Sequence, residues 1–121
     1  IILKTDAAAK DMYEVLAGYD GVEENQVEEN QVEGNGEEAC DISLLTREST
    51  SFQNGISITS VRMSKGLEFD EVLIPQADCR TYTSDFDRGL LYIACTRAMH
   101  RLTLTYSGKE TEFISGQPPF L

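Results

Sequence analysis

Residues 56–74 read ISITSVRMSKGLEFDEVLI, and this stretch decides the fold. Apolar and polar residues alternate from Ile56 to Val61, which predicts a strand. The run Val72–Ile74 predicts a second strand, buried on both faces. The block Ser60–Asp70 lies between them and puts charged residues directly after the first strand. A rigid scaffold that ends in charged loop residues is a common way to present a binding site.

A second block, LLYIACTRA, occupies residues 90–98. It lies inside a predicted helix from Asp85 to about Met99, for which Ser84 is the expected N-cap. Acidic residues open this helix, and Arg97 and Arg101 are expected near its end, as the helix dipole favours. Its wide apolar surface predicts a helix that packs on a sheet.

The remaining pattern completes an alternation of strands and helices. Further predicted elements are strands at Ile1–Leu3, Ile42–Thr46 and Leu102–Tyr106, a helix at Ala7–Ala17 capped by Thr5 or Asp6 and ended by Gly18, and a short helix at Lys109–Ser115. This order favours an α/β layered sandwich with a mainly parallel sheet. In such sheets ligands bind at the carboxyl ends of strands, where we place both the block after Ile56–Val61 and the corner around Arg97.

The formal net charge of −11 argues against a nucleic-acid-binding domain at first sight. However, residues 20–41 contain nine acidic residues and no basic one. Without these nine, 12 acidic residues face 10 basic ones, so the rest of the chain is nearly neutral. Residues 22–33 repeat Val-Glu-Glu-Asn-Gln, which predicts a mobile acidic loop or a weak hairpin. A contact surface for a basic partner is the functional alternative.

Length and composition predict one domain over residues 1–121, with residues 20–41 as an acidic low-complexity loop. The chain begins with Ile1, which suggests a piece of a longer protein. No signal peptide or membrane span is predicted. Cys40, Cys79, Cys95 and the single His100 fit no metal-ligand or disulfide spacing, so reduced thiols and a cytoplasmic location are expected.

The turn Lys65-Gly66-Leu67-Glu68-Phe69 could carry chemistry. Gly66 permits a sharp turn and a close approach of the backbone to a ligand. Glu68 would point outward, where a carboxylate can accept hydrogen bonds from sugar hydroxyls, and Arg62 and Lys65 could meet phosphates. A Lys-Gly turn with an exposed Glu is also common in proteins with no site there.

Arg97 has two interpretations. It could be an arginine finger, which stabilises charge that develops on a transferring γ-phosphate. Alternatively, it could form a structural salt bridge or cap carbonyl groups at the helix end. The residue pattern alone favours the structural role.

Taken together, the two blocks resemble the last two signature motifs of superfamily 1 helicases of the UvrD/Rep/PcrA type. Ser64–Asp70 is similar to motif V, and Leu90–Ala98 is similar to motif VI. The Glu-Phe-Asp and Cys-Thr-Arg-Ala-Met-His strings, together with the short segment before motif V, resemble the helicase IV (HelD) branch, which lacks the large inserted domain.

This resemblance implies the second RecA-like motor domain of a DNA helicase, a P-loop NTPase-type three-layer sandwich. ATP with Mg²⁺ would bind between this domain and an N-terminal RecA-like domain of the same protein, which would hold the Mg²⁺. By carry-over, Glu68 would contact the ribose, Gly66 would lie near the nucleotide and Arg97 would reach the γ-phosphate. Ser60 and Arg62 would line the path of single-stranded DNA.

Two features depart from the helicase pattern. Many relatives have Thr-x-His where this chain has Ser60-Val61-Arg62, so the DNA contact there differs in kind. The sequence also contains no phosphate loop and no strand that ends in a paired Asp-Glu for Mg²⁺, so these 121 residues alone are expected to be inactive as an ATPase. An alternative to the motor domain is a helicase-like ATPase module that acts on RNA polymerase without unwinding DNA, with the acidic segment as its docking element.

Overall fold

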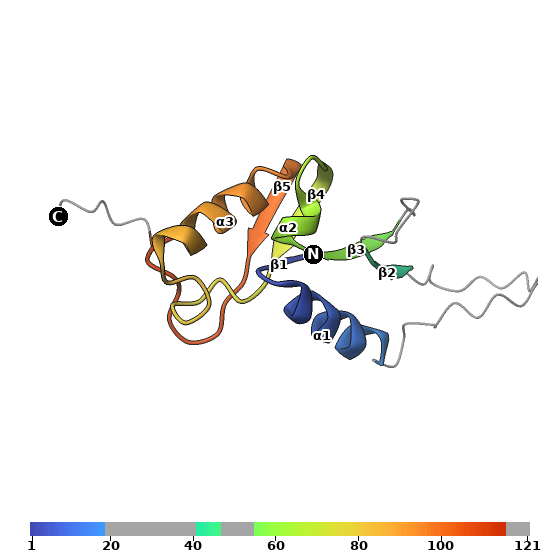
Figure 1. The fold of residues 1–121 in the computed structure, drawn as a ribbon, viewed down its shortest axis with the longest axis horizontal. Coiled ribbons are helices and arrows are strands. Elements are labelled where there is room, and N and C mark those ends of the chain that lie inside the picture. The colour runs from blue at the N-terminus through green and yellow to red at the C-terminus, as the bar shows by residue number, and fades with distance from the viewer. Residues whose placement is uncertain (19–40, 47–54, 116–121) are drawn as a thin grey trace, which may run out of the picture.

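The computed structural model describes residues 1–18, 41–46 and 55–115 (Figure 1). In chain order, its elements are β1 (Ile2–Leu3), α1 (Asp6–Ala17), β2 (Ile42–Leu44), β3 (Ile56–Ser60), α2 (Val61–Ser64), β4 (Phe69–Ile74), α3 (Asp85–Cys95) and β5 (Ala98–Leu104). The predicted acidic repeat at residues 22–33 lies outside the described residues. No helix in the described part of the chain is both long enough and apolar enough to cross a membrane.

All paired strands among the described residues run parallel, as the sequence predicts. β3 pairs with β1 on one side and with β2 on the other, giving the order β1-β3-β2. β4 pairs with β5, with Phe69 opposite Ala98 and Ile74 opposite Leu104. β1 also contacts β4, which brings the two sheets together. The chain is therefore a mixed α/β fold with parallel strands.

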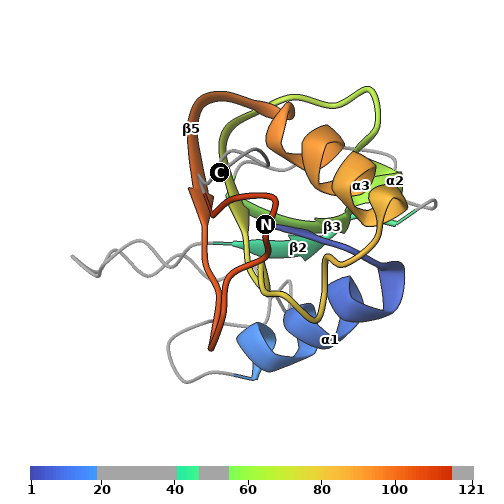
Figure 2. The same ribbon diagram turned by 90° about the vertical axis from the view of Figure 1, so that its left-hand side faces the viewer.

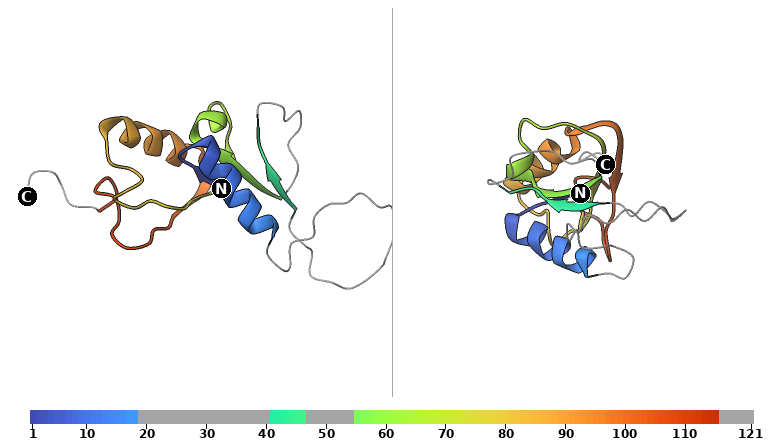
Figure 3. Two further views of the ribbon diagram at one scale, coloured as in Figure 1. Left: turned by 60° about the horizontal axis from the view of Figure 1, so that its bottom comes forward. Right: turned by 90° about the vertical axis from the view of Figure 1, so that its right-hand side faces the viewer.

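Helices cover both faces of the strands, as Figure 2 and the right panel of Figure 3 show, with α1 on one side and α3 on the other. The two residues of β1 display this division, because successive side chains of a strand point to opposite faces. Ile2 packs in a core with Val72, Ile74 and Leu91, whereas Leu3 packs with Ala9 and Ile58 beneath α1. The result is three layers, and β1 lies between both cores.

The predicted helix starts are confirmed. Thr5 caps α1 by accepting a hydrogen bond from the backbone of Ala8 at 3.1 Å, and Gly18 ends the helix. Ser84 caps α3 through a capping box with Asp87, in which each side chain accepts from the other residue's backbone. Each cap satisfies backbone donors that the first helical turn leaves open.

The predicted end of α3 was wrong. The helix ends at Cys95 rather than near Met99, and β5 begins at Ala98 rather than Leu102. Pairing with β4 starts immediately, because the Phe69 nitrogen donates to the Arg97 carbonyl at 2.8 Å. Strand pairing thus ends the helix before its sequence pattern does, and Arg101 lies on β5.

The predicted helix at Lys109–Ser115 was also wrong. Glu110 instead forms an antiparallel bridge with Asp78. The hydroxyl of Thr111, which is fully buried, donates to the Tyr82 carbonyl at 2.8 Å. Tertiary contacts with the segment that follows β4 therefore hold this region in turns. The same packing buries the Tyr82 side chain and raises its pKa to about 12.

The connection from β3 to β4 contains a helix that the sequence did not reveal. The one-turn helix α2 starts at Ser60, whose hydroxyl accepts from the Met63 nitrogen at 3.3 Å. The chain then turns sharply at Gly66, as predicted, with a φ of 81°. A side chain at Gly66 would meet no atom within 4 Å, so backbone conformation alone requires glycine there.

A partly buried ion pair links Lys4, at the end of β1, to α3. The Lys4 Nζ lies 3.0 Å from an Asp87 carboxylate oxygen and donates to the Thr81 carbonyl at 2.7 Å. The other carboxylate oxygen of Asp87 accepts from the Thr83 and Ser84 nitrogens at 2.9 and 3.2 Å. Hydrogen bonds from the Thr83 backbone and from Lys4 hold the pKa of Asp87 well below its usual range, despite its burial.

We expect Asp87→Asn to lower the free energy of unfolding by about 2 kcal/mol at pH 7, because hydrogen bonds to a buried charge are lost. The folded pKa is lower than the unfolded one, so this contribution is present at neutral pH and is lost as the pH falls below about 4. Denaturant titrations between pH 7 and pH 3 would measure it. The exposed Asp85 opens the same helix, so Asp85→Asn is the matched control. Equal effects of the two variants at pH 7 would contradict the role of the ion pair.

Two glycines with open space around them should respond in opposite directions to alanine. Gly66→Ala should destabilise the chain by about 1 kcal/mol because of its positive φ. Gly89→Ala should stabilise it by up to about 1 kcal/mol, since Gly89 lies inside α3 with no atom near its missing Cβ. Thermal unfolding of both variants tests this pair, and destabilisation by Gly89→Ala would show that the space around α3 is not open.

Candidate functional site

Arg97 lies in the turn between α3 and β5, and its guanidinium group is half-buried. Nε donates to the Ile93 carbonyl at 3.2 Å, Nη1 to the Leu67 carbonyl at 3.3 Å and Nη2 to the Thr96 hydroxyl at 3.2 Å. The Ile93 contact is the carbonyl cap that the sequence offered as the structural alternative. No carboxylate pairs with Arg97 among the described residues, so the salt bridge is not seen.

These contacts leave part of the guanidinium group without a partner. It carries five N–H groups, and each terminal nitrogen uses one of its two in the bonds above. One N–H on each terminal nitrogen therefore has no partner among the described residues. A cation held in place by carbonyl groups but not neutralised by an acid can still bind an anion.

Glu68 lies beside Arg97 because both of its neighbours in sequence bond to that arginine. The Leu67 carbonyl accepts from the guanidinium group, and the Phe69 nitrogen donates to the Arg97 carbonyl. Glu68 itself is exposed and has no hydrogen bond or ion pair in the described structure. The structure thus brings Arg97, Glu68 and the exposed Gly66 together at one rim of the molecule, which we call the Arg97–Glu68 rim.

The position of this rim in the sheet differs from the prediction. Arg97 directly precedes β5 and Glu68 directly precedes β4, so both lie at the amino ends of these strands. The predicted position of the Arg97 corner, at a carboxyl end of the sheet, was therefore wrong. Ser60, in contrast, does end β3, as predicted. The connection through α2 joins the carboxyl end of β3 to the amino end of β4.

Ser60 and Arg62 form a second cluster with Asp6, which is the first residue of α1. The Asp6 carboxylate accepts hydrogen bonds from the Ser60 hydroxyl through one oxygen and from Arg62 through the other. Ser60 is buried, whereas Arg62 is more than half exposed. A groove of about 430 Å³ opens beside these three residues, and its lining also includes Lys10, Thr46 and Met63.

The contacts of Asp6 with Ser60 and Arg62 were not predicted from the sequence. Asp6 was predicted only as one of two cap candidates for α1. The signal could not be found along the chain, because Ser60 and Arg62 are 54 and 56 residues away from Asp6. Parallel pairing of β1 with β3 brings them together, since Leu3 lies opposite Ser60.

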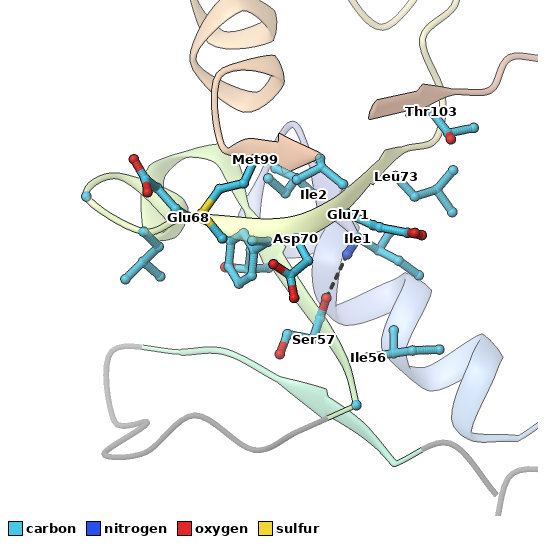
Figure 4. Close-up of a pocket in the computed structure, with 16 residues that line it drawn as sticks. Ile1, Ile2, Ile56, Ser57, Glu68, Asp70, Glu71, Leu73, Met99 and Thr103 are labelled. Atoms are coloured by element: carbon cyan, nitrogen blue, oxygen red, sulfur yellow. Dashed lines mark hydrogen bonds between the residues drawn. The ribbon is translucent and has the colours of Figure 1, made fainter. Parts of the chain in front are cut away.

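A larger groove of about 1020 Å³ runs along the face of β4 (Figure 4). Glu68 and Met99 lie toward one end of it, and Leu73 and Thr103 lie toward the other. Its lining combines apolar side chains with the carboxylates of Asp70 and Glu71, which repel phosphate. Arg97 does not line it. The groove thus shares Gly66 and Glu68 with the Arg97–Glu68 rim, whereas the Arg97 side chain lies outside its lining.

A comparison with known protein families matches the part of the chain that contains both sequence blocks. The family model described as the UvrD-like helicase C-terminal domain matches residues 55–105, which contain both sequence blocks. No curated protein matches the sequence.

Fourteen chains of solved structures match this chain. One is the crystal structure of the C-terminal domain of a possible DNA helicase from Lactobacillus plantarum WCFS1. It shares 25% sequence identity with this chain and superposes with a TM-score of 0.69. The match covers 94% of this chain but 58% of the other, so this chain spans little more than half the length of its structural relative. By sequence motif and by fold, the chain resembles the C-terminal, RecA-like domain of UvrD-like helicases.

Proposed function

We propose that this chain is the C-terminal motor domain of an ATP-dependent superfamily 1 DNA helicase or translocase. In this proposal it supplies one wall of an ATP site and part of a path for single-stranded DNA. An N-terminal RecA-like domain of the same protein supplies the other wall. The observation that carries the proposal is the Arg97–Glu68 rim, where the residues on both sides of Glu68 bond to Arg97 and neither charged side chain has an ion-pair partner among the described residues.

The chemistry of the rim suits a nucleoside triphosphate. The free N–H groups of Arg97 are donors for phosphate oxygens, and the free oxygens of Glu68 are acceptors for ribose hydroxyls. Gly66 leaves open space where a side chain would otherwise stand, so a nucleotide can approach the backbone there. The residues present therefore fit ATP as the ligand.

Each residue has a distinct task in this proposal. Arg97 stabilises the negative charge that develops on the γ-phosphate during transfer, and its bonds to the Ile93 and Leu67 carbonyls hold the guanidinium group in position beforehand. Glu68 orients the ribose. Ligands on the N-terminal motor domain would hold Mg²⁺, which would neutralise part of the phosphate charge.

Ser60 and Arg62 are the proposed residues at the path of single-stranded DNA, with the exposed Arg62 as the direct contact because Ser60 is buried. A hydroxyl and a guanidinium group are both common donors to phosphate oxygens. The exposed guanidinium group of Arg62 stands at the edge of the 430 Å³ groove, with Lys10 also in the lining. These positive charges offset the acidic net charge of the chain locally. Arg62 would thus hold a phosphate where many relatives have His.

The helicase IV branch remains a finer proposal that rests on the Glu-Phe-Asp and Cys-Thr-Arg-Ala-Met-His strings. The alternative module that acts on RNA polymerase depends on the acidic residues 20–41, of which the structure describes only Asp41. No contact among the described residues favours that alternative over the motor domain.

In the intact protein, Arg97→Ala should reduce the turnover number for ATP by on the order of 10³-fold, because charge on the γ-phosphate loses its stabiliser. Arg80→Ala is the matched control, since Arg80 is an exposed arginine in the segment between β4 and α3. Steady-state ATPase assays with single-stranded DNA present would measure both variants. Turnover by Arg97→Ala within threefold of the control would remove Arg97 from the mechanism.

The 121-residue chain alone should show no ATPase activity above a buffer blank, with or without single-stranded DNA. It lacks a phosphate loop and the Mg²⁺ ligands that a complete site requires. Purified chain at micromolar concentration in a phosphate-release assay would test this. Hydrolysis that Arg97→Ala abolishes in the isolated chain would contradict the two-domain site.

A further inference from the structure

Asp6 accepts hydrogen bonds from the two residues that the proposed function places at the path of single-stranded DNA. One carboxylate oxygen accepts from the Ser60 hydroxyl, and the other accepts from Arg62. A phosphodiester presents two unesterified oxygens that accept hydrogen bonds from the same kinds of donor. Asp6 therefore binds this pair of donors in the way that a backbone phosphate would.

The two donors differ in their freedom to change partner. Ser60 is fully buried and its hydroxyl also accepts from the Met63 nitrogen, so it is fixed as the cap of α2. Its bond to Asp6 anchors that carboxylate. The Arg62 side chain is 56% exposed and the Asp6 side chain 50% exposed, so solvent reaches their ion pair. Arg62 is thus the donor that can leave Asp6 for another anion.

We propose that Asp6 is an internal competitor for the phosphate-binding arginine, and so a residue that sets the affinity of this site for single-stranded nucleic acid. In the free protein, Asp6 holds Arg62 through one oxygen. A phosphodiester that enters the groove beside Lys10 must take Arg62 from Asp6. This inference rests on the proposed function, because it assumes that Arg62 contacts a nucleic-acid phosphate.

The expected size of the effect follows from the exposure of the pair. Solvent-exposed ion pairs contribute about 0.2–1 kcal/mol, which corresponds to a change of up to about fivefold in a binding constant. Removal of the competing charge should also make binding more sensitive to salt. Each phosphate contact to a single strand contributes about −0.7 to the slope of log affinity against log salt concentration. An arginine that is already paired with Asp6 contributes a smaller slope.

The test uses the intact protein and a labelled oligothymidylate, with binding followed by fluorescence anisotropy at several salt concentrations. Asp6→Asn keeps an oxygen that can accept from Ser60 but removes the charge that holds Arg62. Asp11→Asn is the matched control, because Asp11 is exposed on the same helix and changes the net charge equally. Thermal unfolding of each variant checks that the fold is retained.

Asp6→Asn should bind the oligonucleotide about threefold more tightly than Asp11→Asn, with a steeper salt slope. In an Arg62→Ala background, Asp6→Asn should bind no more tightly than Asp11→Asn, because the competitor acts through that arginine. Equal affinities of the two variants with Arg62 present, or weaker binding by Asp6→Asn, would overturn the inference. In the latter case Asp6 would instead position Arg62 for the phosphate.

The Arg62→Ala variant distinguishes failure of the proposed DNA contact from failure of the competitor role of Asp6. If Arg62→Ala weakens binding but the two Asp variants behave alike, the competitor role fails and the proposed DNA contact stands. If Arg62→Ala leaves binding unchanged, the DNA contact itself fails and the competitor role fails with it.

Discussion

The ion pair between the partly exposed Lys4 and the buried Asp87 is the constraint on which the site depends. A carboxylate that is removed from water is costly unless its oxygens are satisfied. Here Lys4 and the donors of Thr83 and Ser84 satisfy them, so the first turn of α3 is fixed against the end of β1. The place where α3 starts then determines where it ends. Because the helix is rigid over its 11 residues, the ion pair at its first turn also sets the position of Arg97 beyond its last turn.

Short chain segments and hydrogen bonds connect the residues of the proposed nucleotide site to those of the proposed nucleic-acid site. Lys4 fastens α3, and Asp6, two residues later, fastens Ser60 and Arg62. From Arg62, α2 and one turn lead to Leu67, whose carbonyl accepts from Arg97. The segment from β1 to the start of α1 therefore positions both features. This segment belongs to neither of the two blocks that resemble helicase motifs, yet it fixes the positions of both.

Local signals in the sequence were sufficient for much of the architecture. The caps at Thr5 and Ser84 act within one helical turn, and they were predicted correctly. The alternating pattern of β3 and the sharp turn at Gly66 are local in the same sense. The errors fall where a distant partner competes with local preference. Pairing with Phe69 stops α3 before Met99, and the bridge to Asp78 keeps residues 109–115 from forming a helix.

The layered α/β class and the parallel strands could be predicted from the sequence, because they follow from periodicity and the order of the elements. Arg97 and Glu68 became nucleotide-site candidates through the resemblance of the two blocks to helicase motifs. Only the tertiary structure decided that these two residues share a rim, that carbonyl groups rather than an acid hold Arg97, and that Asp6 binds Ser60 and Arg62. Apart from the bond between Arg97 and the Ile93 carbonyl four residues earlier, these facts depend on contacts between residues about 30 or more positions apart. The order of the strands brings these residues together, and no local sequence pattern predicts that order.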